Sequence, residues 1–114
     1  LEEYLIANGY NYDGTTTGNK IAKSMASTTG WNSSIGTYSP GNNQSLNNSS
    51  GFNAFPEGGC FGSFSSAGSR AFFWSSAEGS ANIAWCRRLY NTEGALQRSS
   101  WTKQNGFSVR FIRD

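Results

Sequence analysis

The chain contains no histidine, so the commonest general base and the commonest metal ligand of proteins are both missing. Its seven acidic residues form neither an Asp-x-Asp pattern nor an EF-hand loop. The glycine-rich stretches lack the lysine and the strand-to-helix context of a phosphate loop. These absences argue against an enzyme, a calcium site and a nucleotide site, and we expect no cofactor and no bound metal ion.

Cysteine is also scarce, because the chain has only Cys60 and Cys86. They lie far apart and form no Cys-x-x-Cys pattern, so the sequence gives no support for a zinc site. The pair could form a disulfide, or they could be two unrelated thiols. We favour unrelated thiols, with Cys60 in a loop and Cys86 serving as a small apolar residue on a strand.

Charged residues make up only 14% of the chain, and the net charge is +2. The positive residues are scattered and form no basic stripe, which argues against nucleic acid as a partner. No apolar run approaches the roughly 20 residues that a membrane span needs, so we expect no membrane insertion. The length fits one domain over residues 1–114, and an opening in mid-helix predicts a domain truncated at its N-terminus and taken from a longer protein.

What the chain does have is glycine, serine and asparagine, which together exceed a third of its residues. Such a polar composition would fit disorder, but 15% of the residues are aromatic, which disordered chains lack. We therefore expect an ordered domain built from turns, short strands and few helices.

Two short helices are predicted near the start. The first is expected to end at Asn8-Gly9, with Leu1, Tyr4 and Leu5 on one face. The second is expected over residues 20–26, where Ile21 and Met25 are four apart and the two lysines fall on the opposite side. After a long loop over residues 31–50, aromatic runs between turn residues predict strands at 52–55, 61–64, 71–76, 83–90, 96–101 and 107–112.

The clearest pattern is a β-hairpin around residues 91–94. Their sequence, Asn-Thr-Glu-Gly, is typical of a type I turn. Closing the hairpin there places Leu89 opposite Leu96 and Arg87 opposite Arg98. The two-residue period then gathers polar and aromatic side chains on the other face, as a recognition surface would: Cys86, Arg88, Tyr90, Gln97, Ser99 and Trp101.

An ordinary solvated sheet face would show the same alternation, so this pattern alone leaves both interpretations open. The inward positions of the hairpin and of the last strand carry three arginines, Arg87, Arg98 and Arg110. We interpret them as structural and expect them to pair beneath the sheet with Glu78 or Asp114.

Several segments resemble a known family, the Fibrobacter succinogenes major paralogous domain. They are LIANGYNYDGTTTGNKIAKSMAS near the start, FFWSSAE at 72–78, AWCRRL at 84–89 and NGFSVRFIRD at 105–114. The resemblance covers nearly the whole chain. It implies an α+β, C-type lectin-like fold, with two short N-terminal helices packed on antiparallel β-sheets with long loops. Relatives are typically exported or surface proteins of Bacteroidetes, which implies a secreted or cell-surface location, or a phage virion.

Some relatives are diversified by retroelements between WSS and GFSVR. That resemblance implies a set of variable, ligand-binding positions here: Gly79, Ala81, Ile83, Cys86, Arg88, Tyr90, Asn91, Thr92, Gln97, Ser99, Ser100, Trp101 and Gln104. Adenine mutagenesis of asparagine codons does not yield Trp, Gln or Glu. This stretch nevertheless contains Glu93, Gln97, Trp101 and Gln104. Retroelement diversification and ordinary divergence of a paralogue therefore both remain open.

The sequence thus favours a binding module, an adhesin or receptor-binding domain, that presents this variable hairpin surface to a cell-surface protein or glycan. The alternative is a structural decoration domain of a cell surface or virion with no specific ligand. Formylglycine-generating oxidases share the implied fold, but their active cysteines lie much closer in sequence than Cys60 and Cys86. We therefore expect no enzyme.

Overall fold

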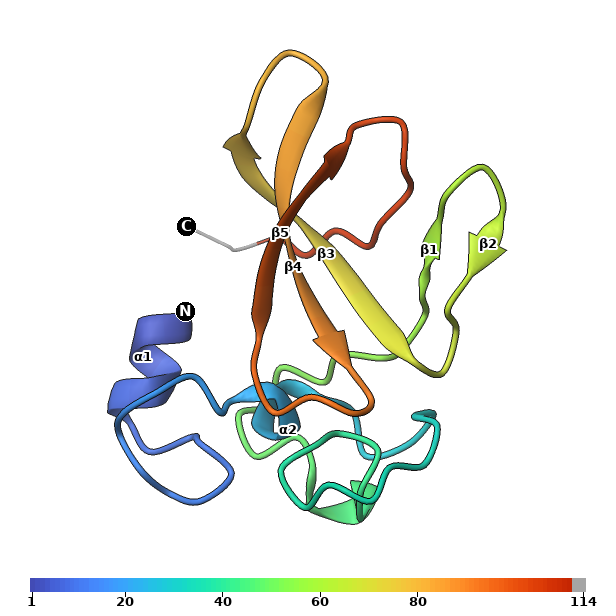
Figure 1. Ribbon diagram of the computed structural model, residues 1–114. Coiled ribbons are helices and arrows are strands. Elements are labelled where there is room, and N and C mark those ends of the chain that lie inside the picture. Colours follow the sequence, from blue (N-terminus) through green and yellow to red (C-terminus); the bar gives the residue numbers. More distant parts are fainter. Residues whose placement is uncertain (112–114) are drawn as a thin grey trace.

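The computed structural model describes residues 1–111, in which a layer of helices and loops packs against one end of a three-stranded antiparallel sheet (Figure 1). The N-terminal half contains α1 (Glu2–Ala7), α2 (Ala22–Met25) and the 3-10 helix η1 (Gln44–Leu46). The C-terminal half contains β1 (Gly59–Cys60), β2 (Phe64–Ser65), β3 (Arg70–Glu78), β4 (Ile83–Tyr90) and β5 (Gln97–Thr102). Two short helices before antiparallel sheets confirm the predicted α+β class.

The first helix ends where the sequence predicts it to end. Asn8 caps α1, and Gly9 follows with a φ of 78°. The predicted apolar face is wrong in part, since Leu5 is buried while Leu1 and Tyr4 are mostly exposed. The helix meets the core through Leu5 and its partly buried neighbour Ile6, so Leu1 and Tyr4 remain outside it.

The second helix is shorter than predicted and is buried all round. Ile21 and Met25 enter the core as expected, but Lys23 is also buried, with only 7% of its surface exposed. The loop over residues 31–50 folds over this lysine and was expected only as a surface loop. The Lys23 ammonium donates to the carbonyl oxygens of Ser39, Asn42 and Asn43 and, at 2.9 Å, to Asn47 Oδ1.

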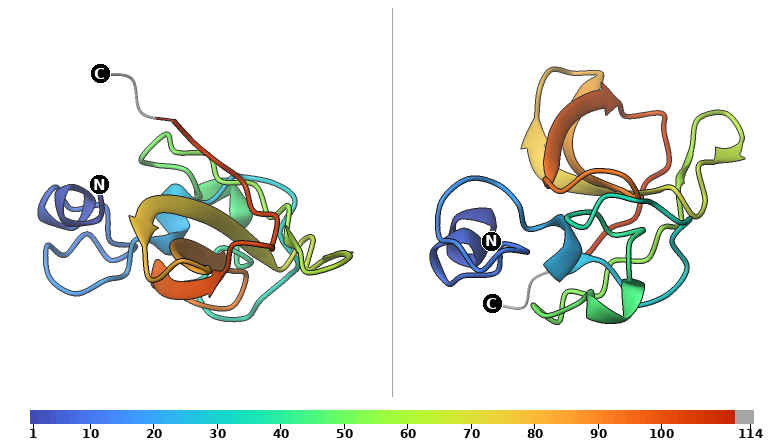
Figure 2. Two further views of the ribbon diagram at one scale, coloured as in Figure 1. Left: turned by 90° about the horizontal axis from the view of Figure 1, so that it is seen from above. Right: turned by 60° about the horizontal axis from the view of Figure 1, so that its bottom comes forward.

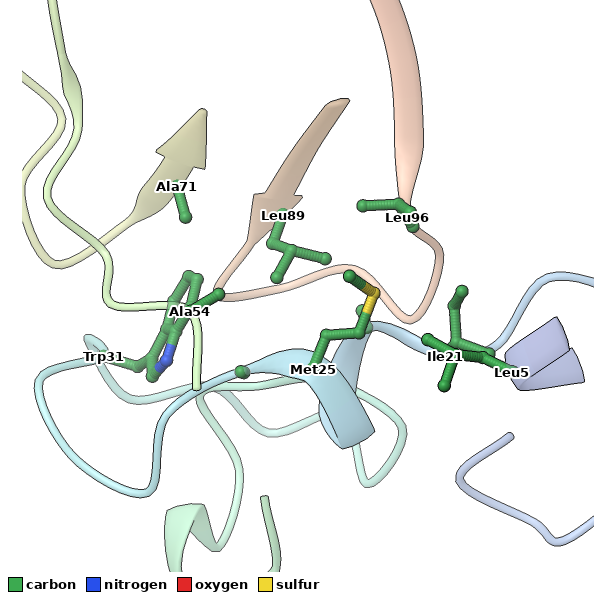
Figure 3. Close-up of a cluster of buried hydrophobic side chains, with 10 residues drawn as sticks. Leu5, Ile21, Met25, Trp31, Ala54, Ala71, Leu89 and Leu96 are labelled. Carbon is green, nitrogen blue, oxygen red and sulfur yellow. The ribbon is translucent and has the colours of Figure 1, made fainter. Parts of the chain in front are cut away.

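The main core lies between α2 and the adjoining end of the sheet (Figure 3). Leu89 and Leu96, the predicted hairpin pair, are buried there against Met25 and Ile21. The loop of residues 31–50 reaches the same end of the sheet, where Gly41 donates its backbone N–H to the carbonyl of Asn91 at 2.9 Å. A side chain at Gly41 would collide with that carbonyl. This contact fixes the long loop beside the β4–β5 turn.

Three predicted strands are shorter than expected, or absent. Residues 61–64 form most of a tight hairpin, in which Gly62 takes a φ of 88° between β1 and β2. Residues 52–55 make a single bridge, from Ala54 to Ala26, and residues 107–111 make one from Ser108 to Phe73. Ile112, the last residue of that predicted strand, lies outside the described residues. A short aromatic run between turns indicates that its side chains will be packed against other apolar groups. It does not show that the backbone will find a neighbouring strand to pair with.

The three-stranded sheet has the order β3-β4-β5, and its β3–β4 hairpin extends away from the core. The β3–β4 register shifts between Trp74 and Glu78, and there the Ser75 hydroxyl donates to the Trp85 carbonyl at 2.8 Å. Seen from above, α1 and the β1–β2 hairpin lie on opposite sides of this sheet (Figure 2). Each face of the sheet therefore has a different neighbour.

Candidate ligand-binding face

The predicted register of the hairpin is confirmed, because Arg87 stands opposite Arg98 and Arg88 stands opposite Gln97. Strand β3 extends the same alternation on the other side of β4, with Phe72 opposite Arg88 and Trp74 opposite Cys86. One face of the sheet, here called the hairpin face, is thereby assembled from three strands. Its members are Arg70, Phe72, Trp74, Cys86, Arg88, Tyr90, Gln97, Ser99 and Trp101.

One half of the hairpin face is covered by aromatic side chains from two loops. Phe61, from the β1–β2 turn, lies 5.2 Å from Trp101 and 5.5 Å from Phe72 between ring centroids. Phe107, after β5, stacks on Phe72 at 4.6 Å and lies 4.5 Å from Trp74. These five rings form what is here called the aromatic cluster, so this half of the face is a second small core.

The cover changes the role of two expected ligand-binding residues. Cys86 is fully buried, and its sulfur lies 3.2 Å from the Ser99 hydroxyl oxygen. That oxygen also accepts the indole N–H of Trp101 at 3.0 Å. The expectation that Cys86 is presented to a ligand is wrong, because two loops cover its position. Trp101 is half-buried and uses its polar group internally, so it is chiefly a packing residue.

The other half of the hairpin face is polar and partly open to solvent. Arg88 donates from Nε to Gln97 Oε1 at 3.0 Å across the β4–β5 pair. The guanidinium carbons of Arg70 and Arg88 lie 4.8 Å and 5.1 Å from the ring centroid of Tyr90. All four side chains are half-buried. They are here called the arginine cluster, and cation–π contacts hold their relative positions.

The opposite face carries the arginines that were expected to pair with Glu78 or Asp114. The expected pairing with Glu78 is wrong. Arg87 reaches Glu2 at 3.8 Å, and exposed Arg98 lies over Trp85 at 3.8 Å from the ring centroid. Exposed Arg110 lies over Phe52. Glu78 instead pairs with Lys103, which follows β5. The register places Glu78 opposite Ala84, and Ala84 opposite Trp101 near the end of β5. Asp114 lies outside the described residues.

The remaining expected positions do not join the hairpin face. Exposed Gly79, Ala81 and Ile83 lie at or beside the β3–β4 turn, whereas Asn91 and Thr92 lie in the β4–β5 turn. The two turns are at opposite ends of β4, about 23 Å apart for a strand of this length. Ser100 faces the other side, opposite Trp85, and exposed Gln104 follows β5. The expected set therefore spans several surfaces.

Three residues of this region were missed by the sequence reasoning. Arg70 begins β3 opposite Tyr90, one position before the predicted strand start. The sequence contained the information needed to place Arg70. Extending the predicted strand by one residue and pairing it with β4 brings Arg70 beside Tyr90. Phe61 and Phe107 were recognised only as parts of strands. Nothing local in the sequence shows that they fold onto the hairpin face.

The site offers hydrogen-bond donors and aromatic surface but no metal-binding set. Over residues 1–111, no three Asp, Glu, His or Cys side chains gather as potential metal ligands. Both cysteines are free thiols. The helices in this range are all too short and too polar to cross a membrane.

A family model described as the Fibrobacter succinogenes major domain matches residues 1–113. The comparisons with curated proteins and with solved structures found no match. Because the match covers all but the last residue, the chain belongs to the Fibrobacter succinogenes major domain family.

Proposed function

We propose that this domain is a ligand-binding module, an adhesin or receptor-binding domain, that uses the open half of the hairpin face. The arginine cluster carries the proposal. Arginine and tyrosine are the residue types enriched at protein interfaces, and here they are held by contacts along β4 and across to its neighbouring strands. A preorganised surface loses little side-chain freedom when a ligand binds.

The proposal extends to the fold type and the location. A C-type lectin-like fold is supported by two short helices beside antiparallel sheets and by long loops that follow the helices. We further propose a secreted or surface location, on a cell or a phage virion, with a cell-surface protein or glycan as the partner. Arg88 and Tyr90 belong to the positions that retroelement diversification would vary, and both residue types can arise from it, which fits variable recognition.

The first test is binding of the fluorescently labelled domain to a glycan array and to fixed bacterial cells. We expect the Arg88→Gln and Tyr90→Thr variants to lose most of the signal, because each removes part of the arginine cluster. The matched control is Arg98→Gln, since Arg98 stands on the neighbouring strand with its guanidinium over an aromatic ring, but on the opposite face.

The outcomes separate the proposal from its alternative. Retained binding by Arg98→Gln together with lost binding by the other two variants supports recognition through the hairpin face. Equal signals from all four proteins, or no signal from any, would contradict it and favour a structural decoration domain without a specific ligand. Thermal unfolding of each variant confirms that the fold is intact.

A further inference from the structure

Two positive charges lie close together on the hairpin face. The guanidinium carbons of Arg70 and Arg88 are within 4.8 Å and 5.1 Å of the same Tyr90 centroid. They are therefore at most about 10 Å apart, which is comparable to the screening length of roughly 8 Å at physiological salt. Two like charges at this separation repel each other and create a local positive potential.

No described carboxylate compensates these charges. Within residues 1–111, the ion pairs join Lys20 to Asp13, Arg87 to Glu2, and Lys103 to Glu78. Arg88 uses its Nε for Gln97, and its terminal N–H groups have no partner among the described residues. The Arg70 side chain makes no hydrogen bond in that range. Both guanidinium groups thus keep donors free for another molecule.

Such donors suit an oxyanion. A planar guanidinium binds a carboxylate or sulfate through two parallel N–H groups, and a second one close by completes the charge balance. The positive region is compact, unlike the extended stripe that nucleic acid or a run of acidic residues needs. Beyond it the same face continues with neutral Gln97, an amide that can bind hydroxyl groups.

We propose that the arginine cluster binds an acidic glycan, with Arg70 and Arg88 holding a sugar carboxylate or sulfate. The inference rests on the proposed function and specifies its ligand class. The anionic group accepts hydrogen bonds from the free N–H groups of Arg70 and Arg88, and the neutral hydroxyls of the ligand extend toward Gln97. Tyr90 keeps both arginines in position through its ring.

The experiment measures binding of the domain to oligogalacturonate by titration calorimetry, with fully methyl-esterified oligogalacturonate as the matched ligand. Chondroitin sulfate and polyglutamate complete the set. We expect at least one of the two anionic glycans to bind. Where oligogalacturonate binds, its ester should bind at least tenfold more weakly, because esterification removes the charge and keeps the sugar. Binding should weaken as salt is raised from 50 to 200 mM, as expected for two closely spaced charges.

The variants locate the site. Arg70→Gln and Arg88→Gln should each weaken binding about tenfold or more, the loss expected for one charge-assisted contact. Arg70→Lys keeps the charge but loses the two-pronged geometry, and should fall between Arg70→Gln and the wild type. Arg98→Gln should bind like the wild type.

Each failure has a distinct meaning. If neither anionic glycan binds, or if oligogalacturonate binds and its ester binds equally well, the acidic-glycan inference is overturned. If polyglutamate binds while both glycans fail, the anion is carried by a peptide and the glycan assignment is wrong. Loss of array binding in Arg88→Gln and Tyr90→Thr would still support the proposed function in all these cases, so the two failures are distinguishable.

Discussion

The two halves of this chain are ordered by different interactions. In the N-terminal half, Lys23 and Asn47 hold a long loop through hydrogen bonds to backbone carbonyls. In the C-terminal half, the rings around Phe72 hold two loops against the sheet by apolar contact. A polar loop rich in asparagine and serine has little apolar area to bury, so it needs an internal donor. The aromatic loops need no such donor.

The largest effect is expected from breaking the aromatic cluster. Phe72 is fully buried and contacts Phe61, Trp101 and Phe107. Phe72→Ala should lower the free energy of unfolding by about 3 to 5 kcal/mol, the usual cost of deleting a buried ring. Urea-induced unfolding followed by tryptophan fluorescence measures this change.

The matched control is Phe64→Ala, because Phe64 is also a strand phenylalanine, on β2, but is 88% exposed. Its change should stay within about 0.5 kcal/mol. A Phe72→Ala loss no larger than that of Phe64→Ala would show that the aromatic rings do not stabilise the second core.

A smaller effect is expected from breaking the polar half. Burial lowers the pKa of the Lys23 ammonium below its usual value, and the surrounding oxygen atoms offset the cost of keeping it charged. Lys23→Met should lower the free energy of unfolding by about 2 kcal/mol, because buried carbonyls lose their donor. Hydrogen exchange should become faster in residues 39–47.

Lys103→Met serves as the control for Lys23→Met, since Lys103 pairs with Glu78 at the surface and should contribute little. Fast exchange confined to residues 39–47 in the Lys23 variant would support the comparison between the two halves. Unchanged exchange there would mean that the loop is held by its other hydrogen bonds, such as those of Asn47.

The comparison also explains which features the sequence could predict. The hairpin register followed from a two-residue period and a turn of known type, both of which are local. The C-terminal end of α1 followed from Asn8-Gly9 for the same reason. The alternation also placed Arg88 and Tyr90 on one face, but it could not show which part of that face is covered.

What the sequence could not predict are contacts between distant loops. Helical spacing placed Lys23 opposite Met25, but nothing in that spacing shows that residues 39–47 fold over the lysine. In the same way, Phe61 and Phe107 are far apart in the chain and meet only on the sheet. Half of the candidate site was therefore predictable, and the cover on the other half was not.

The smallest effect is expected from acid, and it should fall on the polar half alone. The Lys20 ammonium, 2.7 Å from the Asp13 carboxylate, and the Thr15 hydroxyl lower the pKa of Asp13 to about 2. Because folding lowers this pKa from 3.8, the contribution of Asp13 is complete above pH 3.8 and is lost as the pH falls through about 2. Asp13→Asn should remove this part of the acid dependence and leave the aromatic cluster unchanged.

The measurement is the unfolding temperature between pH 5 and pH 2, with the near-ultraviolet circular dichroism of the tryptophans reporting the C-terminal half. An identical acid dependence in wild type and Asp13→Asn would show that this surface pair does not stabilise the loop over residues 13–20, since an exposed ion pair is readily screened by solvent.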